Sequence, residues 1–380
     1  MQLLALSLFT PVIIFHSISQ PDWGFFAHRK INKYAVYTLP DPLFSWYKKH
    51  IEYLEIHAVD PDKRRYAVKG EAYFHYLDMD VYESELLENQ PLEQLRWKYS
   101  QVTFTRGDST VHIKRVGDPR FPELLDDSVQ NAVLDVLDKL IIDNEVAYSW
   151  VHEGNKYELD LIDSFSMHGL LPFRIRSVYK QLENAFREKD VKKILRLSAD
   201  LGHYIGDAHV PLHTTENYNG QLTGQDGIHA FWESRLPELL LHKKYFLSIS
   251  PAEYLDDITG SVWAVINESH KNVNQVLSCE QESRSSMPPE KINCLDKRSN
   301  TYSWTQCPEY AEAFNECLGD MVWDRWERSI QFLGSIWFTA WANAGEPDLF
   351  KEDISNEYLA GEHTNAADGH QLTPTRECEQ

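Results

Sequence analysis

Apolar residues recur along most of the chain at the three- and four-residue spacing of a helix face, and strand signals are few. This pattern predicts helices over 44–59, 124–148, 161–187, 191–205, 228–241, 254–277 and 310–341. Asp190 stands where it can cap the fourth helix, and Pro308 falls just before the last one. The sequence therefore predicts an all-α fold built as a single multi-helix domain.

Three segments depart from this pattern. Residues 1–22 contain an apolar run from Leu3 to Phe15, which is too short to span a bilayer and has the length of a signal-peptide core. A buried N-terminal strand or helix is the alternative. Residues 280–306 turn polar and are expected to form a loop inserted in the domain, which spans 23–345. Residues 346–380 are expected to be a disordered tail. We expect a secreted or periplasmic protein without a transmembrane segment.

The charge balance is strongly acidic, because 58 Asp and Glu residues face 37 Lys and Arg residues and leave a net charge of −21. Such a surface does not attract polyanions by itself, so no stable nucleic-acid complex is expected. Bound metal ions would reverse the field locally, which keeps nucleic acid possible as a substrate.

The cysteines all lie near the C-terminal end of the chain. There are five of them: Cys279, Cys294, Cys307, Cys317 and Cys378. Their spacing matches no zinc finger. In an exported protein they predict two local disulfides with one cysteine left over, and five free thiols are the alternative.

The densest chemistry lies between Leu201 and Glu238. His203 and Asp207 are four residues apart on a predicted helix, so both side chains lie on one face. His229 and Glu233 repeat that spacing on the next helix, and His213 follows the proline that ends the first one. Imidazole and carboxylate groups at such spacings are typical zinc ligands. Each pair taken alone could equally be an ordinary side-chain contact.

The string HYIGDAHVPLH, followed by HAFWE, resembles the signature of the trinuclear-zinc phosphodiesterases. That family includes the bacterial zinc-dependent phospholipase C and the fungal single-strand nucleases with 3′-nucleotidase activity. Further upstream, WGFFAH, HAVDPD and YFHYLD stand in the order in which the family has its other ligands. The resemblance touches most of residues 23–233 and is dense only over 201–238.

The resemblance implies a fold of that family and three zinc ions. The ligands of the first would be Asp60, His75, His203 and Asp207, and those of the second His213, His229 and Glu233. The third would be held by His28, the second oxygen of Asp207 and the backbone amine and carbonyl of Trp23. Trp23 has a free amine only if the leader is cut just before it. Asp62 is the alternative to Asp60, which we prefer for its Ala-x-Asp context and its distance to His75.

By this resemblance the protein is expected to be a zinc-dependent hydrolase of phosphate esters. Asp60 would also orient the attacking water, and Tyr76 and Asp78 would contact the substrate. Glu233 and the short gap before His229 favour a phospholipase C-like enzyme, whereas the close spacing of Trp23 and His28 favours a single-strand nuclease. The substrate would accordingly be a phospholipid, or single-stranded nucleic acid or a nucleotide. A purely structural zinc site in an extracellular protein is the non-enzymatic alternative.

Overall fold

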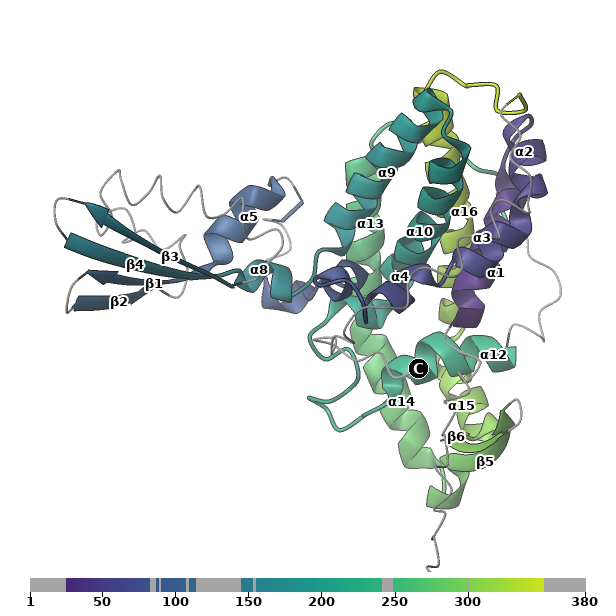
Figure 1. The fold of residues 1–380 in the computed structure, drawn as a ribbon. Coiled ribbons are helices and arrows are strands. Elements are labelled where there is room, and N and C mark those ends of the chain that lie inside the picture. Colours follow the sequence, from purple (N-terminus) through teal and green to yellow (C-terminus); the bar gives the residue numbers. More distant parts are fainter. Residues whose placement is uncertain are drawn as a thin grey trace, which may run out of the picture.

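The chain is mostly helical, as the sequence predicts, and carries two small antiparallel sheets in addition (Figure 1). The computed structural model describes residues 25–82, 87–88, 90–106, 109–113, 145–152, 155–240, 249–298 and 301–351. The predicted leader over 1–22 and most of the predicted tail therefore lie outside the described residues.

The helix α10 (Val191–His209) is the centre of the helical body. It begins at Asp190, whose carboxylate accepts a hydrogen bond from the Lys193 backbone N–H at 3.1 Å. Almost all of its side chains are buried, which is typical of a helix surrounded by other helices. The helices that contact it are α1 (Phe25–Ala35), α3 (Ile51–His57), α9 (Leu171–Glu188), α13 (Ile258–Lys271) and α16 (Met321–Asn343).

Shorter elements surround this bundle. The remaining α-helices are α2 (Leu43–Lys49), α4 (Asp60–Arg64), α5 (Leu92–Tyr99), α8 (Ser164–Met167), α11 (Ile228–Ala230), α12 (Leu236–Leu240), α14 (Val273–Ser286) and α15 (Pro308–Leu318). Single turns of tighter helix are η1 (Val36–Thr38), η2 (Glu71–His75), η3 (Met79–Val81), η6 (Pro211–Thr214) and η8 (Pro289–Lys291), and η7 (Phe231–Arg235) is a π-helical turn.

Most predicted helices are confirmed, although several are divided. The helix predicted over 191–205 is α10, and the one over 228–241 is the run from α11 through η7 to α12. The segments 44–59, 161–187, 254–277 and 310–341 each contain two helices instead of one. In the first of these, the break falls at His50 between α2 and α3.

A four-stranded antiparallel sheet lies between α5 and α8 along the chain and was not predicted. Its strands are β1 (Gln101–Arg106), β2 (Ser109–Ile113), β3 (Glu145–His152) and β4 (Asn155–Ile162), in the spatial order β2-β1-β4-β3. Figure 1 shows the sheet extending away from the helical bundle, beyond α5 and α8. The helix predicted over 124–148 is wrong at its end, because 145–148 belong to β3. Its earlier residues lie outside the described ranges.

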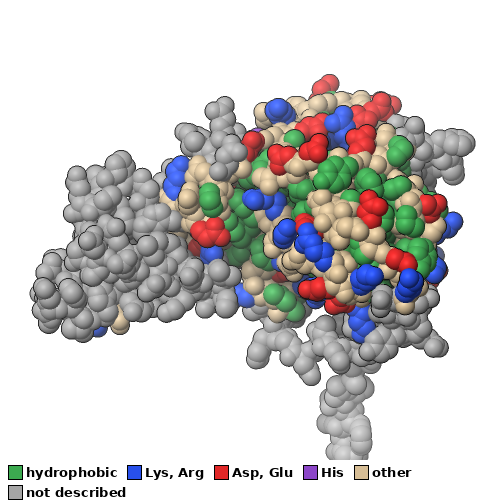
Figure 2. Space-filling model, turned by 90° about the horizontal axis from the view of Figure 1, so that it is seen from above, with side chains coloured by type: hydrophobic (Ala, Val, Ile, Leu, Met, Phe, Trp, Pro, Cys, Tyr) green, Lys and Arg blue, Asp and Glu red, His purple; other side chains and the backbone are tan. Residues whose placement is uncertain are grey.

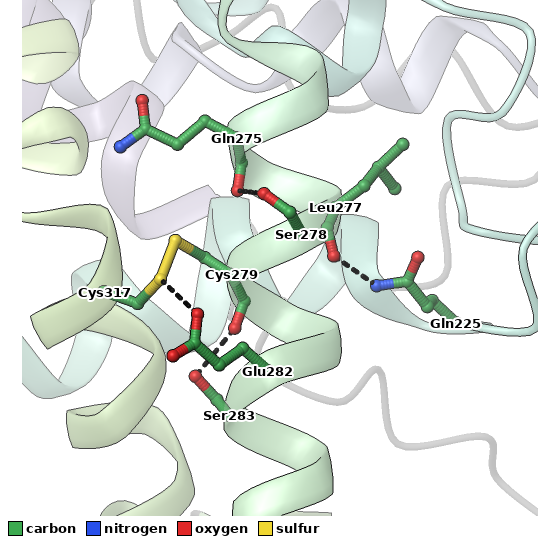
Figure 3. Close-up of a disulfide and its surroundings, with 8 residues drawn as sticks. All are labelled: Gln225, Gln275, Leu277, Ser278, Cys279, Glu282, Ser283 and Cys317. Atoms are coloured by element: carbon green, nitrogen blue, oxygen red, sulfur yellow. Dashed lines mark hydrogen bonds between the residues drawn. A yellow bond between two sulfur atoms is a disulfide. The ribbon is translucent and has the colours of Figure 1, made fainter.

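The polar segment 280–306 is ordered, so its prediction as a loop is wrong. It contains the end of α14, the turn η8 and a hairpin of β5 (Asn293–Arg298) and β6 (Thr301–Gln306). The disulfide Cys294–Cys307 closes the hairpin, and Cys279–Cys317 joins α14 to α15 (Figure 3). The prediction of two local disulfides is confirmed, and Cys378 lies outside the described residues.

The surface gives no sign of a membrane span in the part of the chain that is described. None of the described helices combines the length and the apolar character needed to cross a bilayer. On the face drawn in Figure 2, acidic and basic side chains are interspersed among apolar ones. The mixture leaves no continuous basic surface on the described part of that face.

Candidate metal centre

Both predicted His-x-x-x-acid pairs lie on helical turns and face each other across a buried site. His203 Nε2 lies 3.4 Å from Asp207 Oδ2 on α10, and His229 Nε2 lies 2.9 Å from Glu233 Oε2 where α11 continues into η7. Pro211 ends α10 and begins η6, which turns His213 back toward the same site. These helices place five donor groups together, as the spacing predicts.

The first donor group joins α10 to the segment 60–75. Asp62 Oδ1 lies 3.4 Å from His203 Nε2 and 3.6 Å from His75 Nδ1, and Asp207 Oδ2 lies 3.0 Å from the same His75 atom. Two ligands bound tetrahedrally to one Zn²⁺ at about 2.0–2.1 Å are about 3.3 Å apart. The separations of these four donors therefore fit one tetrahedral ion.

The preference for Asp60 as a ligand is wrong in this structure. Asp60 accepts hydrogen bonds from His57 Nδ1 at 2.5 Å and Lys63 Nζ at 2.9 Å, and its side chain is 30% exposed. Residues two apart on a helical turn point to nearly opposite sides, so only one of the two aspartates of α4 can face the site. The structure turns Asp62 inward, and Arg65 Nη1 approaches it to 3.5 Å.

This correction predicts different outcomes for two similar substitutions. Asp62→Asn is expected to lower the metal content by about one equivalent per chain, because it removes a charged ligand of the first group. Asp60→Asn is the matched control and is expected to keep the full content. Elemental analysis of the two purified variants beside the parent protein checks this. Metal loss in the Asp60 variant alone would contradict the assignment.

The second donor group contains only three side chains. His213 Nε2 lies 2.7 Å from His229 Nε2 and 3.2 Å from Glu233 Oε2. The loop before His229 is held by Gln225, whose side-chain amide donates to the Leu277 carbonyl of α14 at 2.8 Å (Figure 3). A tetrahedral ion held by these three donors would have one position left for water or substrate.

The third donor group connects the other two. His28 Nε2 lies 3.5 Å from Asp207 Oδ1 and 3.1 Å from Glu233 Oε1. Each carboxylate thus presents its other oxygen to a neighbouring group, and both bridge between groups. The bridging contact of Glu233 was not predicted. Trp23, the other predicted ligand, lies outside the described residues.

The close approach of His28 depends on a glycine of α10. A Cβ atom at Gly206 would lie 2.7 Å from His28 Nδ1 and 3.2 Å from Ile31 Cδ1, closer than real contacts allow. One turn earlier, Gly202 leaves room for Asn32, whose amide donates to the Ala199 carbonyl at 3.1 Å. The two glycines let α1 lie directly against α10 and bring His28 to Asp207.

Hydrogen bonds on the far side of two histidine rings point their lone pairs into the site. His203 Nδ1 donates to the Ala58 carbonyl at 2.9 Å, and His213 Nδ1 donates to the His75 carbonyl at 2.6 Å. A carbonyl only accepts, so each ring carries its proton on Nδ1 and its Nε2 is a bare acceptor when neutral. These acceptors face carboxylate oxygens, an arrangement that a bound cation would stabilise.

The histidines are in the protonation state that binds metal. Burial lowers the pKa of His75, His203 and His213, which keeps these rings neutral at neutral pH. Burial raises the pKa of Asp62, but His203, His75 and Arg65 outweigh it and hold that pKa below its usual range. Five neutral imidazoles and three carboxylates would leave excess negative charge in a buried place. The donor set therefore fits divalent cations.

A polar network that the sequence analysis missed lies against the first group. Its members are Arg64, Glu71, Arg174, Asp200 and Tyr204. Tyr204 donates to Glu71, Arg174 donates to the Tyr204 hydroxyl at 3.2 Å, and Arg64 donates to Asp200 at 3.1 Å. These contacts fasten α4 and η2, which carry Asp62 and His75, onto α9 and α10. Two cations and two carboxylates in one patch were too far apart in sequence to be linked.

The two residues predicted to contact substrate have structural partners. Tyr76 is buried in the hydrophobic core, and its hydroxyl donates to the Met167 carbonyl at 3.0 Å. Asp78 is also buried and accepts from His168 Nδ1 at 3.1 Å. These contacts explain both side chains as parts of the packing between η2 and α8, and a role in substrate binding stays a prediction.

Neither a protein-family model nor a curated protein matches this chain. The site therefore has to be interpreted from its own residues. It offers three abutting groups of histidine and carboxylate donors that could each hold a metal ion.

Proposed function

We propose that the protein is a zinc-dependent hydrolase of phosphate esters of the trinuclear-zinc phosphodiesterase type, with the helical fold of that family. The observation that carries this proposal is the sharing of Asp207 and Glu233 among three donor groups. Bridging carboxylates hold neighbouring ions close enough to act on one substrate, which is the arrangement used for in-line displacement at phosphorus.

The kind of donors favours zinc and favours catalysis over a structural site. Histidine with carboxylate suits zinc, whereas magnesium and calcium take oxygen ligands. Structural zinc sites are saturated and usually rich in cysteine, and the described cysteines are all in disulfides. The second donor group has three side chains, which leaves a position for chemistry.

Bound zinc would supply Lewis acidity toward phosphoryl oxygens and would lower the pKa of water in the site to about 7. The protein's own residues hold and orient. Asp62 is the ligand carboxylate with the most exposed side chain, at 17%, followed by Glu233 at 14%. Water reaches the site at these two residues, and Asp62 takes the role of orienting the attacking water that we first expected of Asp60.

A phospholipid is the preferred substrate, and single-stranded nucleic acid or a nucleotide is the alternative. The chain's net charge of −21 opposes the binding of nucleic acids and anionic lipids but affects zwitterionic lipids little. Two disulfides are typical of an oxidising compartment, which supports export after removal of residues 1–22.

The test is hydrolysis measured beside metal content. The zinc-loaded protein is assayed on phosphatidylcholine vesicles, single-stranded DNA, a soluble phosphodiester and a soluble phosphomonoester. We expect diester cleavage that disappears with a chelator and returns with zinc, fastest on the lipid. Faster cleavage of DNA would favour the nuclease alternative. A protein that binds zinc and hydrolyses none of the four would have a structural site, and the proposal would be wrong.

Metal removal is also expected to destabilise the fold. An ion present at 1,000 times its Kd contributes about 4 kcal/mol to the free energy of unfolding. Chelation also leaves buried carboxylates unneutralised. We therefore expect the Tm to fall by roughly 10 °C or more, which calorimetry without reductant measures. A Tm unchanged by chelator would show that no tightly bound ion stabilises this site.

A further inference from the structure

A pocket begins at the metal centre and runs between α1, the end of α10, the segment 232–237 and α16. His28 and Glu233 belong to both the donor groups and the pocket wall, so a molecule in the pocket would lie beside the third group. The rest of the wall is mainly apolar, with Ile31, Val210, Pro237 and Val322 among its residues.

Two tryptophans in this wall have unused hydrogen-bond donors. The indole N–H groups of Trp232 and Trp326 are buried and have no acceptor among the residues that the structure describes. Both side chains line the pocket and are more than nine-tenths buried. A buried donor without a partner costs free energy, so a ligand with suitably placed acceptors would be favoured.

The other polar groups of the wall are already engaged. Arg325 Nε donates to the His209 carbonyl at 3.0 Å, and Arg325 Nη1 pairs with Glu268 at 2.9 Å. The Ser329 hydroxyl donates to the Trp326 carbonyl at 2.6 Å. The pocket thus offers apolar contact and two free donors.

We propose that this pocket binds the ester-linked part of a diacylglycerol group, the alcohol portion of a glycerophospholipid substrate. An acyl ester carries carbonyl acceptors on an aliphatic chain and has no donor of its own, which matches the wall. A nucleobase or sugar brings N–H or O–H donors that would need acceptors here, and it matches less well. This inference rests on the proposed function and selects one substrate class for the same centre.

Ester- and ether-linked lipids of the same chain length give the sharpest test, because the ether lacks the carbonyl acceptors. Dihexanoyl-phosphatidylcholine and its dihexyl ether analogue are compared as substrates by kcat/KM. The corresponding glycerol products are compared as ligands by titration calorimetry. Each carbonyl hydrogen bond is expected to favour the ester roughly five- to tenfold.

Trp232→Phe and Trp326→Phe each remove one indole N–H and keep an aromatic ring. Each single substitution is expected to lower the ester preference in both measurements, and the double variant should lose it. Since either single variant is informative, the test does not require the double variant to fold. Trp323→Phe, on the same helix α16, is the matched control and should keep the preference of the parent protein.

The outcomes separate this inference from the function on which it rests. Equal use and equal binding of ester and ether by the parent protein would overturn the pocket assignment, even if both lipids are cleaved. An ester preference that survives in the double variant would overturn it as well. Cleavage of a small soluble diester without cleavage of either lipid would also overturn it, while leaving the hydrolase in place. Absence of all hydrolysis would remove the proposed function.

Discussion

Replacement of Asp207 by asparagine is expected to remove more metal and more activity than any other single ligand substitution. Asp207 presents Oδ2 to His75 and Oδ1 to His28, so one side chain serves two donor groups. An asparagine keeps the shape but has one acceptor oxygen, no charge and an amide that repels cations. Removal of a partner that only orients a ligand typically costs roughly 10- to 100-fold in metal affinity, and a bridging ligand should cost more.

We therefore expect Asp207→Asn to retain at most one of three zinc equivalents and to lose at least about a thousandfold in kcat/KM on a soluble phosphodiester. Elemental analysis and steady-state kinetics measure the two effects. Asp190→Asn is the control on the same helix, because asparagine caps a helix as well as aspartate does. Full metal content together with near-parent kinetics in the Asp207 variant would refute a shared centre.

Gly206→Ala is expected to separate α1 from α10 and to cost metal as well as stability. The added methyl group would overlap His28, whose ring has no room to retreat because it stacks on His203 at 4.1 Å between ring centres. Overpacking of this kind costs about 1–3 kcal/mol. Displacement of His28 should in addition deplete the third group, so we expect close to one equivalent of zinc to be lost.

Gly334→Ala is the matched control for this prediction. A Cβ atom at Gly334 on α16 would lie 1.9 Å from Thr38 Oγ1, a comparable clash beyond the C-terminal end of α1. Denaturant unfolding should show a stability loss of similar size in the two variants, and only the Gly206 variant should lose zinc. If both variants lose zinc equally, metal loss follows from general destabilisation, and the specific role of Gly206 is wrong.

The part of the site that is local in sequence could be predicted. The pairs His203–Asp207 and His229–Glu233 follow from helix periodicity alone, and the structure brings both to one place. The choice between Asp60 and Asp62 could not be made in this way. It depends on the phase of the five-residue helix α4 relative to α10, which tertiary contacts such as Arg65 to Asp62 decide.

The missed sheet shows a different limit. The apolar positions of β1 and β4 alternate with polar ones, as in Val102 and Phe104 or Tyr157, Leu159 and Leu161. That period-two signal was present but short, and the helical spacing of neighbouring segments outweighed it. The hairpin over 293–306 carries few buried apolar residues, and the pairing of Cys294 with Cys307 holds it, so hydrophobic pattern alone could not reveal it.

The network around Tyr204 has a consequence for the way in which the protein acquires its ions. Arg64 and Arg174 balance Asp200 and Glu71 without any contribution from metal, so these contacts can form in the ion-free chain. Asp62 and His75 are then already docked beside His203 before the first ion arrives. Loading becomes the filling of a prepared cavity with little chain entropy left to lose, which favours tight capture from a compartment where free zinc is scarce.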